Sequence, residues 1–304
     1  MSSTYDRSAE DLGNVVGLEH VNVTIPDQGL ATLFYVSGLG LTRDPYMMTS
    51  IDNMWINVGP KSQFHLPTGS PQVLRGQVGL VIPDRAALLT RLGRVKELLR
   101  NTRFGFTEHE DYVEAICPWG NVMRCHEPSS AFGRTTLAMP YVAFDVPLGA
   151  AKGIAAFYRK VMGTQARVED TKGAKAAHVA VGEAQELVFR ETDAEIKAYD
   201  NHHIQVYVAS FSGPHKALSK LGLVTEESNK YQYRFASIVD PENGKELFKI
   251  EHEVRSMTHP MYARPLVNRD PQQNNRNYAQ GHDAWIAGVR ESMDNPRDAV
   301  RRRL

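Results

Sequence analysis

Apolar and polar residues alternate along residues 19–25, near the start of the chain. One side of this run takes Val21, Val23 and Ile25, and the other side takes His20, Asn22 and Thr24. A period of two with β-branched residues predicts a β-strand with one buried face. Pro26 ends the strand, because proline cannot donate a hydrogen bond to a strand ladder. The three polar side chains are therefore expected to share the other face.

A helix and a hairpin are predicted after this strand. Apolar residues have helical spacing within residues 28–37, and Gly38 stops the helix. Residues 54–58 and 62–66 form two further strand-like runs that are separated by a Gly-Pro turn. One unit of the chain therefore consists of a strand, a helix and two or three more strands.

The pattern of the first strand occurs four times. Its copies begin at His20, Gln77, Tyr141 and His203, at intervals of 57, 64 and 62 residues. Further helices are expected near residues 85–99, 150–161 and 213–221, and further strands near 111–116 and 121–126. Repetition at such a period predicts one small module that is copied along the chain. We expect an N-terminal domain of two modules over residues 15–130, a C-terminal domain of two modules over residues 138–255, and an extended arm over residues 256–304.

Composition excludes several classes of function. The 304 residues include 35 basic and 35 acidic side chains, so the chain has no basic field to attract nucleic acid. Cys117 and Cys125 fit no zinc or redox motif, and reduced, buried thiols are expected. No apolar run reaches the roughly 18 residues of a membrane span, and the N-terminus lacks a signal-peptide core. We expect a cytoplasmic protein with no membrane or nucleic-acid partner.

Three motifs resemble those of the vicinal oxygen chelate superfamily, which includes glyoxalase I, bleomycin resistance proteins and extradiol dioxygenases. They are Leu18-Glu-His-Val-Asn-Val23, Phe34-Tyr35 followed by Gly38-Leu-Gly40, and the turns Cys117-Pro-Trp-Gly-Asn121 and Asp240-Pro-Glu-Asn-Gly244. The resemblance covers residues 17–255. It implies an α+β fold in which four βαβββ modules pair into two half-barrel domains. It also implies that metal ligands project inward from the first and last strands of the modules.

The resemblance assigns ligand positions to residues of this chain. In the N-terminal domain they are His20, His65, Gln77 and Arg124, with His126 on the same face as Arg124. In the C-terminal domain they are Tyr141, Val188, His203 and either Leu247 or Phe248, and Glu251 follows later in the same strand. Only His203 of this second set matches the family's ligands, so His203, Tyr141 and Glu251 are the only candidates there. We therefore expect a metal in the N-terminal domain, bound by His20, His65 and Gln77, with His126 as the alternative third ligand.

Two functions from different classes agree with these residues. In the first, a divalent ion (Fe, Mn, Zn or Ni) polarises the oxygens of a small organic substrate in a dioxygenase-like, lyase or isomerase reaction. His126 or Glu114 would then act as the general base. Arg124 would bind an anionic substrate, or it would form an ion pair with Glu114 or Glu110.

In the second, the chain is a metal-free protein of the bleomycin-resistance type that sequesters a planar small molecule. Arg124 would anchor the molecule, and Trp55, Tyr112 and Trp119 would offer stacking surfaces. A metal-free enzyme that uses His20 and His65 as acid and base is a third reading. The predicted arm after residue 255 is also compatible with a homodimer, in which the arm would contact the partner subunit.

Overall fold

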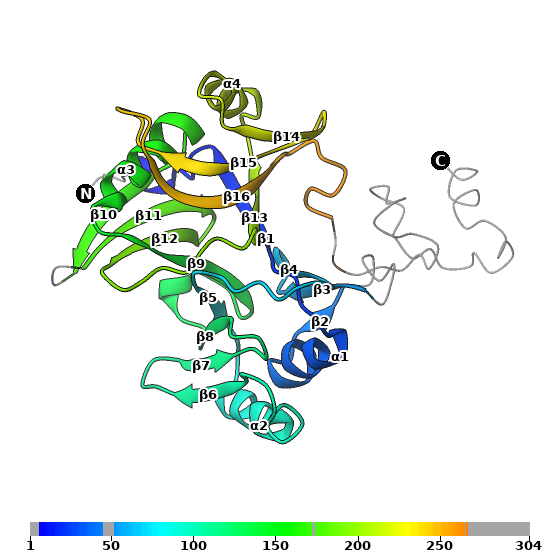
Figure 1. The fold of residues 1–304 in the computed structure, drawn as a ribbon. Coiled ribbons are helices and arrows are strands. Elements are labelled where there is room, and N and C mark those ends of the chain that lie inside the picture. The colour runs from blue at the N-terminus through cyan, green and yellow to red at the C-terminus, as the bar shows by residue number, and fades with distance from the viewer. Residues whose placement is uncertain (1–5, 45–51, 172–173, 265, 267–304) are drawn as a thin grey trace, which may run out of the picture.

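The protein consists mainly of β-strands, which form two eight-stranded sheets with helices at their margins (Figure 1). The computed structural model describes residues 6–44, 52–171, 174–264 and 266. The α+β class and the four βαβββ modules are both as expected.

The first two modules differ mainly in the length of their strands and helices. The first module contains β1 (Val15–Asn22), α1 (Gln28–Ala31), η2 (Thr32–Gly38), β2 (Thr42–Arg43), β3 (Asn53–Val58) and β4 (Ser62–Pro67). The second contains β5 (Gly76–Val81), α2 (Arg85–Val95), β6 (Gly105–Glu108), β7 (Val113–Ile116) and β8 (Val122–His126). Aspartates begin the helices, since the Asp27 carboxylate accepts from the Leu30 amide and the Asp84 carboxylate from the Ala87 amide.

The other two modules repeat the scheme after the connection at residues 127–137, which contains the short helix η3 (Ser130–Phe132). The third module contains β9 (Ala138–Pro147), α3 (Ala150–Phe157), η4 (Tyr158–Met162), β10 (Ala166–Thr171), β11 (Ala174–Gly182) and β12 (Gln185–Thr192). The fourth contains β13 (His203–Val208), α4 (Ser212–Lys220), β14 (Val224–Asn229), β15 (Gln232–Val239) and β16 (Glu246–Ser256). A single turn of helix, η1 (Arg7–Glu10), precedes the first module.

The modules do not pair in chain order. The first sheet has the strand order β14-β15-β16-β13-β1-β4-β3-β2, so it joins the fourth module to the first. The second sheet has the order β10-β11-β12-β9-β5-β8-β7-β6, so it joins the third module to the second. The sheets therefore cross the expected division into residues 15–130 and 138–255. Alternation along a strand shows which face is buried, but it does not show which strand lies alongside.

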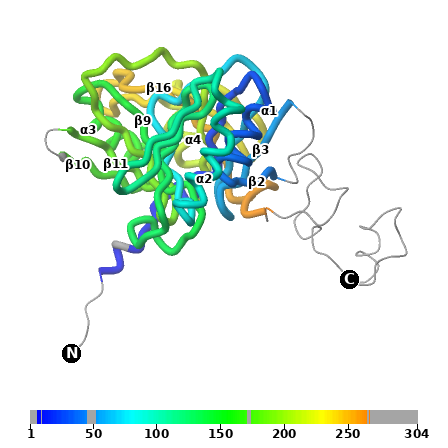
Figure 2. The backbone as a smooth tube through the Cα atoms, turned by 90° about the horizontal axis from the view of Figure 1, so that it is seen from below, coloured from blue at the N-terminus to red at the C-terminus, as the bar shows by residue number. Residues whose placement is uncertain are grey.

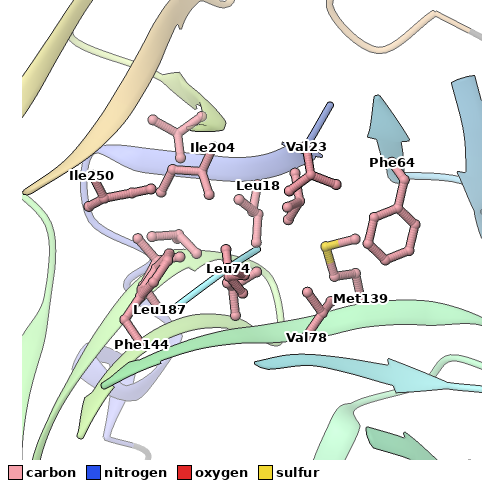
Figure 3. Packing of buried hydrophobic residues seen from close by; sticks show 14 of the residues in the cluster. Leu18, Val23, Phe64, Leu74, Val78, Met139, Phe144, Leu187, Ile204 and Ile250 are labelled. Carbon is pink, nitrogen blue, oxygen red and sulfur yellow. The ribbon is translucent and has the colours of Figure 1, made fainter. Parts of the chain in front are cut away.

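The hydrophobic core lies between the two sheets. Figure 3 shows Leu18 and Ile204 of the first sheet on the side that faces Val78 and Met139 of the second. These side chains are almost fully buried. Strand β1 has a register shift between Leu18 and His20, so His20 and Asn22 lie on the opposite face of the first sheet from Leu18 and Val21. We call this face the first hollow, and the corresponding face of the second sheet the second hollow.

The chain after β16 folds back over the first sheet, as the orange segment in Figures 1 and 2 shows. Met261 packs against Trp55 of β3, and the ring of Tyr262 lies 4.8 Å from that of Tyr207. Arg264 and Asp44 form a buried ion pair at 2.8 Å. This part of the expected arm therefore lies on the body of the protein. Within the described residues, no helix is long and apolar enough to cross a membrane.

Candidate metal centre

Three histidines from three neighbouring strands meet in the first hollow. His20 is on β1, His65 is on the parallel strand β4, and His203 is on the antiparallel strand β13. The register places Asn22 of β1 opposite both His65 and His203. Because Asn22 and His20 share one face of β1, all three imidazoles point to the same side of the sheet. One ring nitrogen of each lies within 4.8 Å of the ring nitrogens of the other two.

The free nitrogens of these rings suit a shared cation. Within the described part of the chain, the Nε2 atoms of His20, His65 and His203 are buried and have no hydrogen-bond partner. Buried polar atoms are normally paired, because an unpaired one loses its hydration without replacement. Neutral imidazole nitrogens are common ligands of Zn²⁺, Fe²⁺ and Ni²⁺. The donor set therefore fits a divalent transition-metal ion.

Neighbouring side chains orient two of the rings by their other nitrogen. The carboxylate of Glu19 lies 3.1 Å from Nδ1 of His20, and the amide of Asn22 lies 2.5 Å from Nδ1 of His65. Glu19 also accepts hydrogen bonds from Tyr207 and Arg255, each at 3.1 Å. Carboxylate or amide contacts at Nδ1 are typical of histidines that bind a metal through Nε2.

Burial favours the neutral form of two of the imidazoles, those of His65 and His203. Burial, followed by the charge of His20, lowers the pKa of His65 well below its ordinary value. The same two causes lower the pKa of His203. Burial alone would raise the pKa of Glu19, but its contacts with His20 and Arg255 lower this pKa to about 2. Glu19 therefore stays ionised, and the rings of His65 and His203 stay unprotonated, as metal ligands must.

The register also identifies a fourth position, Glu253. In the first module His20 lies opposite Gln63 of β4, and the second histidine, His65, comes two residues later. In the fourth module His203 lies opposite Glu251 of β16, and Glu253 comes two residues later. The Glu253 carboxylate is 3% exposed and lies 3.7 Å from Nε2 of His203.

The expectation of Leu247 or Phe248 at this position is wrong. Phe248 is buried in the hydrophobic core, and Leu247 packs against that core. The ladder between β15 and β16 contains two register shifts, which displace the equivalent position along β16. A count from the turn at residues 240–244 could not detect these shifts, so Glu253 was missed.

A chain of ion pairs surrounds the imidazoles on the β16 side. Arg234 contacts both Glu251, at 2.6 Å, and Glu253. Arg255 joins Glu253 to Glu19. Three carboxylates and two guanidiniums therefore border the site. Together these five groups have a net negative charge, which favours a cation there.

Trp55 forms one wall of this site. Its ring stacks on His65 with centroids 3.8 Å apart and meets the His20 ring edge-on at 4.9 Å. Trp55 was expected to offer a stacking surface near Arg124, but it lies beside the histidines, and Arg124 is on β8 of the other sheet. Beyond Glu19, a cavity of about 500 Å³ extends beneath the arm, bordered by Gln63, Tyr207 and Arg264.

Comparisons with known proteins agree on the architecture. Glyoxalase I from Zea mays superposes with a TM-score of 0.57 at 14% identity, over 80% of this chain and 92% of that one. A putative dioxygenase from Bacillus subtilis subsp. subtilis str. 168 superposes with a TM-score of 0.52 at 15% identity, over 81% of this chain and 86% of that one. The chain has the vicinal oxygen chelate fold. No protein-family model matches the sequence, and no curated protein matches it. Activity must therefore be argued from the site.

The second hollow of this vicinal oxygen chelate fold contains most of the other predicted site residues. By the same register, Gln77, Arg124, Tyr141 and Val188 take the four positions that His20, His65, His203 and Glu253 take in the first hollow. Gln77 on β5 and His126 on β8 belong to the other sheet, so the structure does not bring either expected third ligand together with His20 and His65. The error follows from pairing the modules in chain order.

Side chains of the second hollow bind one another. Nε2 of His126 lies 2.9 Å from the hydroxyl of Tyr141, whose ring covers Gly79 so closely that a Cβ there would lie 2.2 Å from it. Arg124 pairs with Glu114 at 3.5 Å and lies over the ring of Tyr112. The predicted bases His126 and Glu114, with Arg124 and Tyr112, are thus in the hollow opposite to the histidine cluster.

Two further features complete the second hollow and its surroundings. A cavity of about 450 Å³ lies over β11, β12, β9 and β5, where His178, Glu186 and Arg190 border it. Trp119 is partly buried and packs against the hydrophobic core. Among the described residues, His20, His65 and His203 form the group of three close metal-ligating side chains.

Proposed function

We propose that this protein is a metal-dependent enzyme of the vicinal oxygen chelate type that acts on a small organic substrate. His20, His65 and His203 would hold a divalent ion, with Glu253 as the fourth ligand. Three buried imidazole nitrogens that converge without hydrogen-bond partners carry this proposal. The site lies between the first and fourth modules, rather than within the N-terminal half of the chain.

The ligand set favours one group of reactions. A bound divalent ion supplies Lewis-acid polarisation of a substrate oxygen. Three imidazoles and a carboxylate make four protein ligands, whereas non-haem iron oxygenases typically use two histidines and one carboxylate. We therefore place isomerase or lyase chemistry ahead of dioxygenation.

The chain's own groups would position the substrate and move its proton. Glu251 lies 3.6 Å from Nδ1 of His203, and its side chain is 27% exposed, so a substrate can reach it. Arg234 keeps this carboxylate in place. Glu251 is thus the proposed proton acceptor, in place of His126 and Glu114. The Trp55 ring would exclude water from one side of the site.

Metal analysis of purified protein tests the proposal directly. The wild type, reconstituted anaerobically with Fe, Mn, Zn or Ni, is expected to retain about one ion per chain, as a single site requires. His203→Ala removes a ligand and should lose the ion. His126→Ala, which changes an imidazole in the second hollow, should retain it. A folded wild type that retains no metal would refute the proposal and favour the metal-free binding protein.

A further inference from the structure

Gln205 occupies the floor of the first hollow, beside the histidine cluster. It lies two residues after His203 on β13, so both side chains point to the same face. In the ladders it is opposite His20 of β1 and Glu253 of β16. Side chains opposite one another on one face lie about 5 Å apart at Cβ. Gln205 is therefore surrounded by three of the four proposed ligands.

Its amide is buried and unused. Gln205 is 0% exposed, and within the described residues neither its Oε1 nor its Nε2 has a hydrogen-bond partner. An amide can donate two hydrogen bonds and accept two, and burial without any of them is costly. Folding does not require this cost, because a leucine would fill a similar volume without it.

Another buried glutamine provides a contrast. Gln185 accepts from the amide of Leu18 at 3.1 Å and donates to the Leu18 carbonyl and the Ser62 hydroxyl, each at 3.0 Å. Its amide connects the two sheets and has a structural role. Gln205 has no such contacts, so both polar atoms of its amide are left unpaired beside the histidine cluster.

We infer that Gln205 is a substrate-binding residue, whose amide hydrogen-bonds an oxygen of the substrate beside the imidazoles. The inference rests on the proposed metal site and adds a residue that recognises the substrate. A neutral amide that both donates and accepts suits an oxygen group of the hydroxyl–carbonyl or hydroxamate class rather than a free phosphate. Three imidazoles and Glu253 already supply four ligands, so Gln205 acts on the substrate and not on the ion.

The test uses the Co²⁺-loaded protein with acetohydroxamate as the probe, and visible absorption reports probe binding. Gln205→Leu should bind Co²⁺ as the wild type does, and its affinity for acetohydroxamate should fall about tenfold, the scale of one hydrogen bond to a charged group. The metal-free variant should unfold at the same temperature or higher, because an unpaired amide is gone. Gln205→Met serves as a second variant of similar length.

Gln185→Leu is the matched control. It should lower the unfolding temperature and leave the affinity for acetohydroxamate unchanged. Equal probe affinities in the wild type and Gln205→Leu, with Co²⁺ bound to both, would overturn the inference but leave the metal site standing. A loss of Co²⁺ affinity in Gln205→Leu would also overturn it, since Gln205 would then be a ligand. A wild type that binds no Co²⁺ would instead contradict the proposed function.

Discussion

The two hollows of this protein are built from the same module and differ in what their equivalent positions hold. The first hollow presents His20, His65, His203 and Glu253, and the second presents Gln77, Arg124, Tyr141 and Val188. The Nε2 atoms of the three histidines in the first hollow have no hydrogen-bond partner, whereas in the second hollow Nε2 of His126 binds the hydroxyl of Tyr141. The backbone therefore sets four inward positions, and the side chains decide whether a cation fits.

A guanidinium makes the second hollow unsuitable for a metal. Arg124 stands at the position of His65 and cannot ligate a cation, because all its nitrogens carry hydrogens and a positive charge. The first hollow instead has the excess carboxylate of the Glu19, Glu251 and Glu253 group. The difference between the hollows is thus electrostatic as well as steric.

The largest expected effect comes from giving the first hollow a residue of the second. His203→Tyr introduces the residue found at the equivalent position, Tyr141. Because one of three imidazoles is lost, we expect affinity for Zn²⁺ to fall by at least about 100-fold, beyond the range for residues that only orient ligands. Competition with a chromophoric chelator measures the Zn²⁺ affinity of each variant. The reverse change, Tyr141→His, should create no metal site in the second hollow while Arg124 is present. If His203→Tyr binds Zn²⁺ as tightly as the wild type does, the comparison of the two hollows is contradicted.

The second expected effect concerns pH. Burial holds the pKa of His65 and His203 well below 6.5, and that of His252 at about 4. Below pH 6.5 the unfolded chain gains protons that the folded chain does not, so the stability of the metal-free protein should fall as the pH decreases. Each histidine contributes up to about 1.4 kcal/mol per pH unit. Urea unfolding at pH 7.5 and pH 5 measures the loss, and equal stability at both would disprove it.

A smaller effect is expected from the residue that orients His20. Glu19→Gln keeps the shape of the side chain but removes the charge that fixes Nδ1 of His20, so Zn²⁺ affinity should fall about tenfold. Glu114→Gln, the matched change in the second hollow, should leave the affinity unaltered. If both variants bind Zn²⁺ equally well, Glu19 has only a structural role.

The smallest effect is expected in the second hollow. Arg124→Leu removes a half-exposed ion pair with Glu114, so the free energy of unfolding should change by less than about 1 kcal/mol. Zn²⁺ stoichiometry should stay at its wild-type value. A second bound ion in this variant would show that Arg124 alone separates the two hollows.

Sequence periodicity was sufficient to predict the four modules and part of the candidate metal site. Alternation in residues 19–25 placed His20 on a polar face, and the repeat period gave four modules. It could not show that β1 lies beside β13, because that pairing joins residues about 180 positions apart by backbone hydrogen bonds that any strand can make. His203 was therefore assigned to a different domain from His20 and His65. Glu253 was missed because bulges between β15 and β16 shift the register.

Anomalous X-ray diffraction from Zn²⁺-loaded crystals, recorded at the zinc edge, tests the central claim most directly. The account predicts one strong peak per chain, bonded to His20, His65 and His203 in the first hollow, at distances of about 2.0–2.1 Å. A peak beside Gln77 and Arg124 in the second hollow, or no peak among the three imidazoles, would contradict it.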